Sequence, residues 1–171
     1  MDFDLYERLL SSAFHFVSFR PRSVREIRLF LKKKIKTSSS ENDDTLEKVM
    51  TRLGELEYAN DEKFALWLIE SRQKHAPKGI RAIRQELVQK GIDKDLIDSL
   101  LSENSPDLHI TPQTDLAKIA IQKKLAVWGK YPTMIRKKKI YEFLSRRGFD
   151  GTTISSVIDG VLGKDYNTSI E

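Results

Sequence analysis

Residues 77–92 read PKGIRAIRQELVQKGI, and the helical pattern of the whole chain can be recognised from this stretch. It places Ile83 and Leu87 four residues apart inside a basic segment, so both side chains lie on one face of a helix. A proline before such a segment and a glycine after it are typical start and stop signals. The stretch therefore predicts a short amphipathic helix with a buried apolar pair.

The same pattern occurs three times along the chain. Ile27 and Leu31 form the first copy and Ile140 and Leu144 the third, so Leu31, Leu87 and Leu144 recur at nearly equal intervals. Apolar residues at helical spacing also lie before and after each copy. Each copy is therefore predicted to contain three helices.

The predicted fold class is all-α, with three tandem three-helix repeats at residues 1–58, 59–104 and 113–165. A unit of roughly 50 residues is near the lower size limit for an independent core. Neighbouring repeats should therefore support one another in an elongated module, straight or curved. Two polar stretches, residues 37–44 and 105–112, are predicted to be loops.

Helix ends can also be predicted. Ser23 and Glu26 have the spacing of a capping box at the start of the second helix. Gly91 and Gly148 stand at the ends of the equivalent helices, where a left-handed residue is expected.

Composition excludes several classes of function. The 171 residues include no cysteine, which excludes a disulfide scaffold, a Cys-ligated zinc site and thiol catalysis. The three histidines lie in separate segments, and no phosphate-binding, dinucleotide-binding, nucleophile-elbow or zincin motif is present. We therefore predict a protein that is not an enzyme and that has no metal site and no cofactor.

No apolar run approaches the ~20 residues that a membrane span requires. The first residues, MDFDLYERLL, also carry no basic leader and no small-residue cleavage site. We expect a monomeric cytoplasmic protein without a membrane partner.

Basic residues gather around the second helix of each repeat. Residues 20–36 hold eight basic residues against one acidic residue, and residues 118–147 hold ten against one. If the repeats stack in similar orientations, these helices would form one basic face for an extended acidic partner. The predicted contact residues are Arg22, Arg25, Arg28, Arg81, Arg84, Arg136, Lys137, Lys138, Arg146 and Arg147.

Aromatic residues near the basic stretches offer a second means of binding nucleic acid, because they can stack on bases. Phe30 and Tyr141 are nevertheless expected to belong to the core, since each lies beside apolar helix positions. Trp128, beside Gly129, has no clear assignment.

Several stretches resemble the RecX regulatory proteins, which modulate the bacterial recombinase RecA. Residues 77–92 are similar to the central segment of the family, and residues 143–149, FLSRRGF, resemble the signature of its third repeat. Residues 56–65, LEYANDEKFA, are similar to its Gly-Tyr-x-Asp-Asp-x-x-Phe-Ala join, with Glu57 in place of glycine and Asn60 in place of aspartate. The resemblance covers residues 13–162.

The resemblance implies three helical repeats that lie in the helical groove of a RecA filament on DNA. It implies inhibition of ATP hydrolysis, strand exchange and coprotease activity, and hence a role in homologous recombination, DNA repair and the SOS response. Direct binding to DNA would be weak and nonspecific.

A second hypothesis is a helix-turn-helix-like DNA-binding module that acts without a recombinase, because short three-helix units with a basic helix are common in DNA-binding proteins. Against it, no helix concentrates Asn, Gln and Arg at the spacing needed to read bases.

Overall fold

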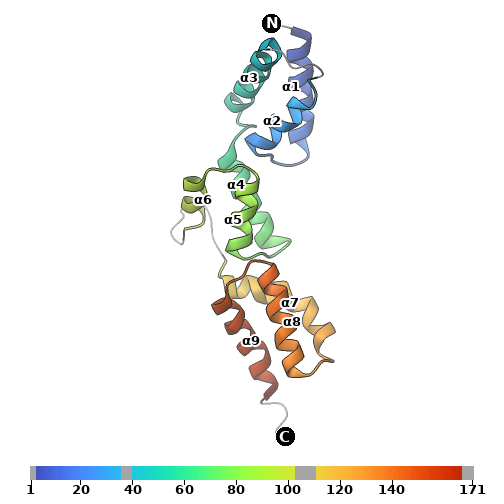
Figure 1. Ribbon diagram of the computed structural model, residues 1–171, viewed down its shortest axis with the longest axis vertical. Coiled ribbons are helices and arrows are strands. Elements are labelled where there is room, and N and C mark those ends of the chain that lie inside the picture. Colours follow the sequence, from blue (N-terminus) through green and yellow to red (C-terminus); the bar gives the residue numbers. More distant parts are fainter. Residues whose placement is uncertain (1–2, 36–39, 103–110, 167–171) are drawn as a thin grey trace. The chain divides into compact units, whose positions relative to one another are not determined.

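The computed structural model describes residues 3–35, 40–102 and 111–166, and in these ranges it contains nine helices and no strand (Figure 1). The all-α prediction is confirmed. The helices are α1 (Phe3–Ser18), α2 (Val24–Lys32), α3 (Ser40–Glu55), α4 (Asp61–Lys74), α5 (Ile80–Gln89), α6 (Lys94–Leu100), α7 (Gln113–Trp128), α8 (Thr133–Arg146) and α9 (Gly151–Tyr166).

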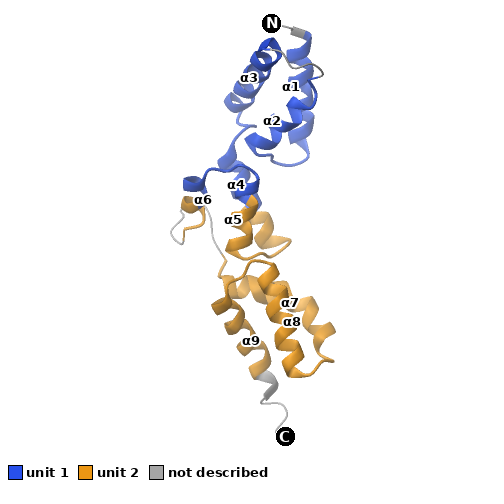
Figure 2. Cartoon of the chain, viewed as in Figure 1, with its two compact units in different colours: residues 1–68, 87–97 blue, residues 69–86, 98–171 orange. Residues whose placement is uncertain are grey.

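The chain divides into two compact units (Figure 2). One comprises residues 1–68 and 87–97, and the other comprises residues 69–86 and 98–171. The division falls within α4, α5 and α6, so the middle helices contribute to both units. The predicted repeat ranges stay a prediction.

The core of the first unit lies between α1, α2 and α3. The apolar pair of α2, Ile27 and Leu31, is fully buried, as its four-residue spacing predicts. The other buried members of this core are Leu5, Leu9, Ala13, Leu46, Val49, Met50 and Leu53. Burial of this apolar stripe drives the association of the three helices.

The core of the second unit is equivalent. Ile140 and Leu144 of α8 are fully buried between α7 and α9. The other buried members are Leu116, Ala117, Ile121, Phe149, Ile154, Val157, Ile158 and Leu162. The same pair of positions on the second helix therefore organises the core in both units.

The predicted helix ends are largely confirmed. Ser23 Oγ accepts a hydrogen bond from the Glu26 amide at 3.1 Å, and the Ser23 amide donates to Glu26 Oε2 at 3.2 Å, which completes the capping box. Gly91 and Gly148 both have φ of 82°, in the left-handed region. Glu57, which stands where the RecX join has glycine, also has a positive φ of 62°.

The prediction of a loop at residues 37–44 is wrong for residues 40–44, because α3 already begins at Ser40. Glu41 and Asp43 lie in the first turn of α3, where carboxylates interact favourably with the positive end of the helix dipole. Residues 37–39 and most of the second predicted loop, 105–110, lie outside the described residues.

In the first unit, the start of α2 lies against the end of α5. Ser23 Oγ donates to the carbonyl oxygen of Lys90 at 2.8 Å. The backbone amide of Val24 donates to Asp61 Oδ1, at the start of α4, also at 2.8 Å. Burial raises the pKa of Asp61, and this hydrogen bond opposes the shift. An amide that α2 cannot satisfy itself is thus satisfied by a later helix.

Glu26 strengthens this contact. Burial disfavours its charge, but hydrogen bonds from Lys90, the Ser23 backbone and Arg20 outweigh burial and hold its pKa below the usual range. The distance from Lys90 Nζ to Glu26 Oε1 is 2.7 Å. A charged pair therefore spans the start of α2 and the end of α5.

In the second unit, the start of α5 makes the same kind of contact with the end of α8. The Gly79 amide donates to the Arg147 carbonyl at 2.9 Å, and the Ile80 amide donates to Gln113 Oε1 at 3.0 Å. Ile80 begins α5 as Val24 begins α2, and Asp61 and Gln113 are the first residues of α4 and α7. We call this arrangement the repeat joint: the helix that begins the next repeat caps the second helix of the repeat before it.

The joint in the second unit leaves no room for a side chain at Gly79. A Cβ there would lie 2.2 Å from the carbonyl oxygen of Gly148, a backbone atom that cannot rotate away as a side chain can. A Cβ on Gly148 would lie 2.5 Å from Ala82 Cβ, and its positive φ adds strain.

We predict that Gly79→Ala lowers the free energy of unfolding by ~1–3 kcal/mol, because the methyl group forces α5 away from the end of α8. Gly160→Ala is the matched control: Gly160 lies in α9 with no atom near the position of a Cβ, and replacing it should raise stability by ~0.5–1 kcal/mol. Urea unfolding followed by circular dichroism measures both. Equal stabilities for the two variants would contradict the joint.

Candidate functional site

The predicted contact residues lie on or beside the second helix of each repeat, α2, α5 and α8. The structure separates them into residues that hold the fold together and residues whose charge faces solvent. This distinction decides which of them can serve a partner.

Arg28 and Arg84 each connect the second helix to the third helix of a repeat. The guanidinium of Arg28 donates to both carboxylate oxygens of Glu47 on α3 and lowers the pKa of that carboxyl, and Arg84 donates to Asp98 on α6. Each arginine directly follows the buried isoleucine of its helix, so this ion pair is a repeated structural feature. Their charges are already neutralised within the chain.

Three further arginines lie near the repeat joints. The Arg25 guanidinium donates to the Gln89 carbonyl at 3.3 Å, and that of Arg147 donates to the Pro77 carbonyl at 3.0 Å. Arg22 lies over the ring of Phe16, with its guanidinium carbon 4.0 Å from the ring centroid, and burial lowers its pKa. These arginines support the helix starts and ends.

Arg136 is half-buried at the start of α8, with Nη2 3.4 Å from the hydroxyl oxygen of Thr133. This contact joins two residues of the first turn of α8.

The remaining predicted residues are the exposed cations, Arg81, Lys137, Lys138 and Arg146. Within the described ranges, the side chains of these four residues form no ion pair or hydrogen bond. Arg81 and Lys138 precede the buried isoleucine of their helices by the same number of positions, so they are equivalent on α5 and α8. Their charge is available for a partner.

Of the aromatic side chains near the basic stretches, Phe30 and Trp128 pack against the cores and Tyr141 is exposed. Phe30 packs against the first core, stacked on Phe16 with ring centroids 4.1 Å apart. Trp128 packs against the second core and meets Phe143 edge-to-face. The prediction that Tyr141 belongs to the core is wrong, because Tyr141 is 51% exposed.

Arg72, Lys78 and Glu86 form an ion cluster in the middle repeat. Glu86 Oε2 accepts hydrogen bonds from Arg72 Nε and Lys78 Nζ, both at 2.9 Å. The hydrogen bond from Arg72 has the largest effect, and together with Lys78 it lowers the pKa of Glu86 to about 2. Arg72 and Lys78 therefore contribute to the fold, because Glu86 neutralises their charge within the chain.

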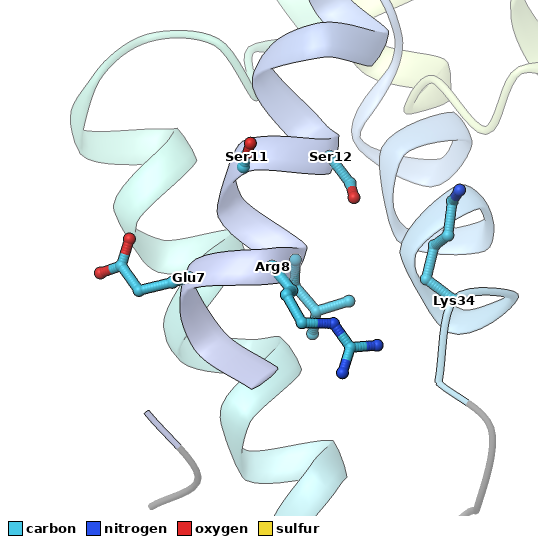
Figure 3. A pocket seen from close by; sticks show the side chains of 6 residues that line it. Glu7, Arg8, Ser11, Ser12 and Lys34 are labelled. Atoms are coloured by element: carbon cyan, nitrogen blue, oxygen red, sulfur yellow. The ribbon is translucent and has the colours of Figure 1, made fainter. Parts of the chain in front are cut away.

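One hollow of about 590 Å³ lies on the first unit, lined by α1 and by Lys34 just after α2 (Figure 3). Arg8 and Glu7 leave α1 on opposite sides, and Ser12 lies above Arg8. Activation of a serine hydroxyl needs a hydrogen-bonded base. Glu7 and Lys34 line the hollow beside Ser11 and Ser12, but within the described residues neither serine side chain forms a hydrogen bond with them.

In the described part of the chain, no cluster of three or more His, Asp or Glu side chains is placed to hold a metal ion. No helix in that part is long and apolar enough to cross a bilayer.

Comparison with known proteins gives the family. Residues 60–101 match the model of the second three-helix domain of RecX, and residues 112–158 match that of the third. The Regulatory protein RecX of Prosthecochloris aestuarii is 32% identical over 155 residues, which cover 91% of this chain and 94% of that protein.

The chain belongs to the RecX family.

Other RecX proteins are similarly related. That of Chlorobium phaeobacteroides is 34% identical over 165 residues, with 94% of this chain and 93% of the relative covered. That of Oceanobacillus iheyensis is 31% identical over 155 residues, but the match spans only 54% of that longer protein and 91% of this chain. The family thus includes members about as long as this chain and others much longer.

Solved RecX structures share the fold. The crystal structure of RecX from Lactobacillus salivarius has a TM-score of 0.69 at 20% identity and covers 92% of this chain and 96% of its own. A second crystal structure of regulatory protein RecX has a TM-score of 0.71 at 25% identity, with 91% and 74% covered.

We predict that Arg147→Ala lowers the free energy of unfolding by about 1–2 kcal/mol, because the Pro77 carbonyl at the repeat joint loses a charged donor. Arg81→Ala should change it by less than ~0.5 kcal/mol, since the Arg81 side chain is exposed and has no partner in the described chain. Chemical unfolding of the two variants beside the unmodified chain checks this. A large loss for Arg81→Ala would show that Arg81 supports the fold.

Proposed function

We propose that this RecX-family chain is a non-catalytic regulator that binds the RecA filament in its helical groove and inhibits ATP hydrolysis, strand exchange and coprotease activity. The observation that carries the proposal is the exposed cation at the same position of α5 and α8, Arg81 and Lys138, which remains unneutralised within the described chain. The family name, regulatory protein, supports a regulatory role.

Repetition makes such binding effective. A filament presents identical protomers at regular intervals, and this chain presents similar helices at nearly equal intervals of sequence. Each cation at the surface of a helix adds modestly to affinity by itself, because exposed charge pairs are screened by solvent. Several contacts on one chain reinforce one another through effective concentration.

The filament, and not this chain, would hydrolyse ATP. Within the described residues, Ser11 and Ser12 in the hollow beside α1 form no side-chain hydrogen bond with a base, and the ion pairs of Arg28 with Glu47 and of Arg84 with Asp98 stabilise the fold. Inhibition would therefore act through binding to the filament. We further propose that the chain acts as a monomer in the cytoplasm. Its own contact with DNA would be weak, nonspecific and sensitive to salt.

The structure does not favour a sequence-specific DNA-binding module. In a three-helix unit of helix-turn-helix type, such as a homeodomain, the third helix enters the major groove. In the middle repeat this helix, α6, is seven residues long and carries Asp95 and Asp98 against a single lysine. Phosphates would repel it.

The test is RecA ATPase activity on single-stranded DNA while the chain is titrated in. Arg81→Glu combined with Arg146→Glu should raise the concentration needed for half-inhibition by about tenfold or more, because attraction becomes repulsion. Lys63→Glu combined with Lys94→Glu applies the same change of charge outside the predicted contacts and should shift it by less than about twofold. Equal inhibition by both double variants would contradict the role of the exposed cations, and absence of inhibition by the unmodified chain would contradict the function itself.

A further inference from the structure

α8 differs in length from its counterparts. α2 and α5 have 9 and 10 residues, whereas α8 has 14. Lys137 is the counterpart of Val24 and Ile80, with which α2 and α5 begin, so residues 133–136 form an additional N-terminal turn. The last repeat therefore presents helical surface that the other two lack.

α8 also exposes more large apolar side chains than α2 and α5 do. α2 exposes one large apolar side chain, Leu29, and α5 exposes one, Val88. α8 exposes three, which are Met134 (77% exposed), Ile135 (44%) and Tyr141 (51%). An exposed apolar cluster on a soluble protein is a common mark of an interface.

The exposure of Tyr141 has a structural origin. Its counterparts are Arg28 and Arg84, which pair with Glu47 on α3 and Asp98 on α6. The position of α9 that corresponds to Glu47 and Asp98 is Ser155, which carries no charge and cannot form an ion pair. The third repeat has thus replaced an internal ion pair by an aromatic side chain directed at solvent.

Cations accompany these apolar groups. Met134, Lys138 and Tyr141 are spaced by four and three residues, which places them in one stripe along α8. Lys137 and Arg146 belong to the same helix, which carries five basic residues against Glu142 alone. The stripe is therefore both apolar and positively charged. We call it, together with Ile135, the α8 stripe.

We propose that the α8 stripe docks an amphipathic acidic segment of the partner protein, with apolar side chains over Met134 and Tyr141 and carboxylates facing Lys137 and Lys138. This inference rests on the proposed function, in which the partner is a RecA protomer. Because α8 is positively charged, it favours binding of a negatively charged segment. Phosphates would satisfy the lysines but would leave Met134 and Ile135 against water, whereas an apolar and acidic surface covers both kinds of side chain.

The experiment measures binding of the chain, labelled with a fluorophore at its N-terminus, to RecA filaments assembled on oligo(dT) with a non-hydrolysable ATP analogue. Met134→Ser combined with Tyr141→Ser should weaken binding at least about tenfold, because the apolar contact is lost. Met134→Leu combined with Tyr141→Phe should retain binding within about twofold, since the stripe stays apolar.

Leu29→Ser combined with Val88→Ser is the matched control, because these side chains are 51% and 54% exposed on the equivalent helices. It should bind within about twofold of the unmodified chain. Thermal unfolding of each variant verifies that these exposed substitutions leave the fold intact.

The outcomes separate the two proposals. If the unmodified chain does not bind filaments, the proposed function fails, and the docking partner fails with it. If it binds and the Met134→Ser and Tyr141→Ser variant binds equally well, only the α8 stripe is overturned. If that variant loses affinity for naked oligo(dT) by the same factor as for filaments, the stripe binds nucleic acid, and a protein occupant is overturned.

Discussion

The start of a helix leaves backbone amides without partners, and this constraint organises the molecule. At α2 and at α5 the first amide is satisfied by the first residue of the next repeat's opening helix, Asp61 or Gln113. Short helices of 9 and 10 residues are marginal alone, so a cap supplied by the neighbouring repeat links the stability of successive repeats. The close approach at Gly79 follows from the same contact, because the amide of Gly79 reaches the carbonyl at the end of α8.

The repeat joint also determines which charges remain for a partner. Arg25 and Arg147 are used at the joints, and Arg28 and Arg84 are used within repeats. Of the ten predicted contact residues, four keep an exposed charge without a partner in the described chain, Arg81 on α5 and Lys137, Lys138 and Arg146 on α8, and on α8 they are accompanied by exposed apolar side chains. Most of the predicted contact residues thus serve the fold.

The repeated apolar pair, the capping box and the two left-handed glycines could be predicted from sequence, because each depends on residues close together in the chain. The ion pairs could not, since Arg28 and Glu47 are 19 residues apart whereas Arg84 and Asp98 are 14 apart, and the longer connection in the first repeat hides their equivalence. The apolar neighbours of Tyr141 predict a core position, but the adjacent Ile140 takes the buried position and Tyr141 faces solvent. The joints depend on contacts between residues as far apart as Ser23 and Lys90.

Amide hydrogen exchange tests the repeat joint most directly. First-turn amides of a helix ordinarily exchange fast, and that of Met134 is a suitable reference, because the N-cap of α8 makes no side-chain hydrogen bond. The amides of Val24 and Ile80 donate hydrogen bonds to the side chains of Asp61 and Gln113. After correction for intrinsic rates, these two amides should exchange about 100-fold more slowly than the amide of Met134. Exchange of Val24 and Ile80 at the rate of Met134 would contradict the joint and, with it, the account of how the repeats are held together.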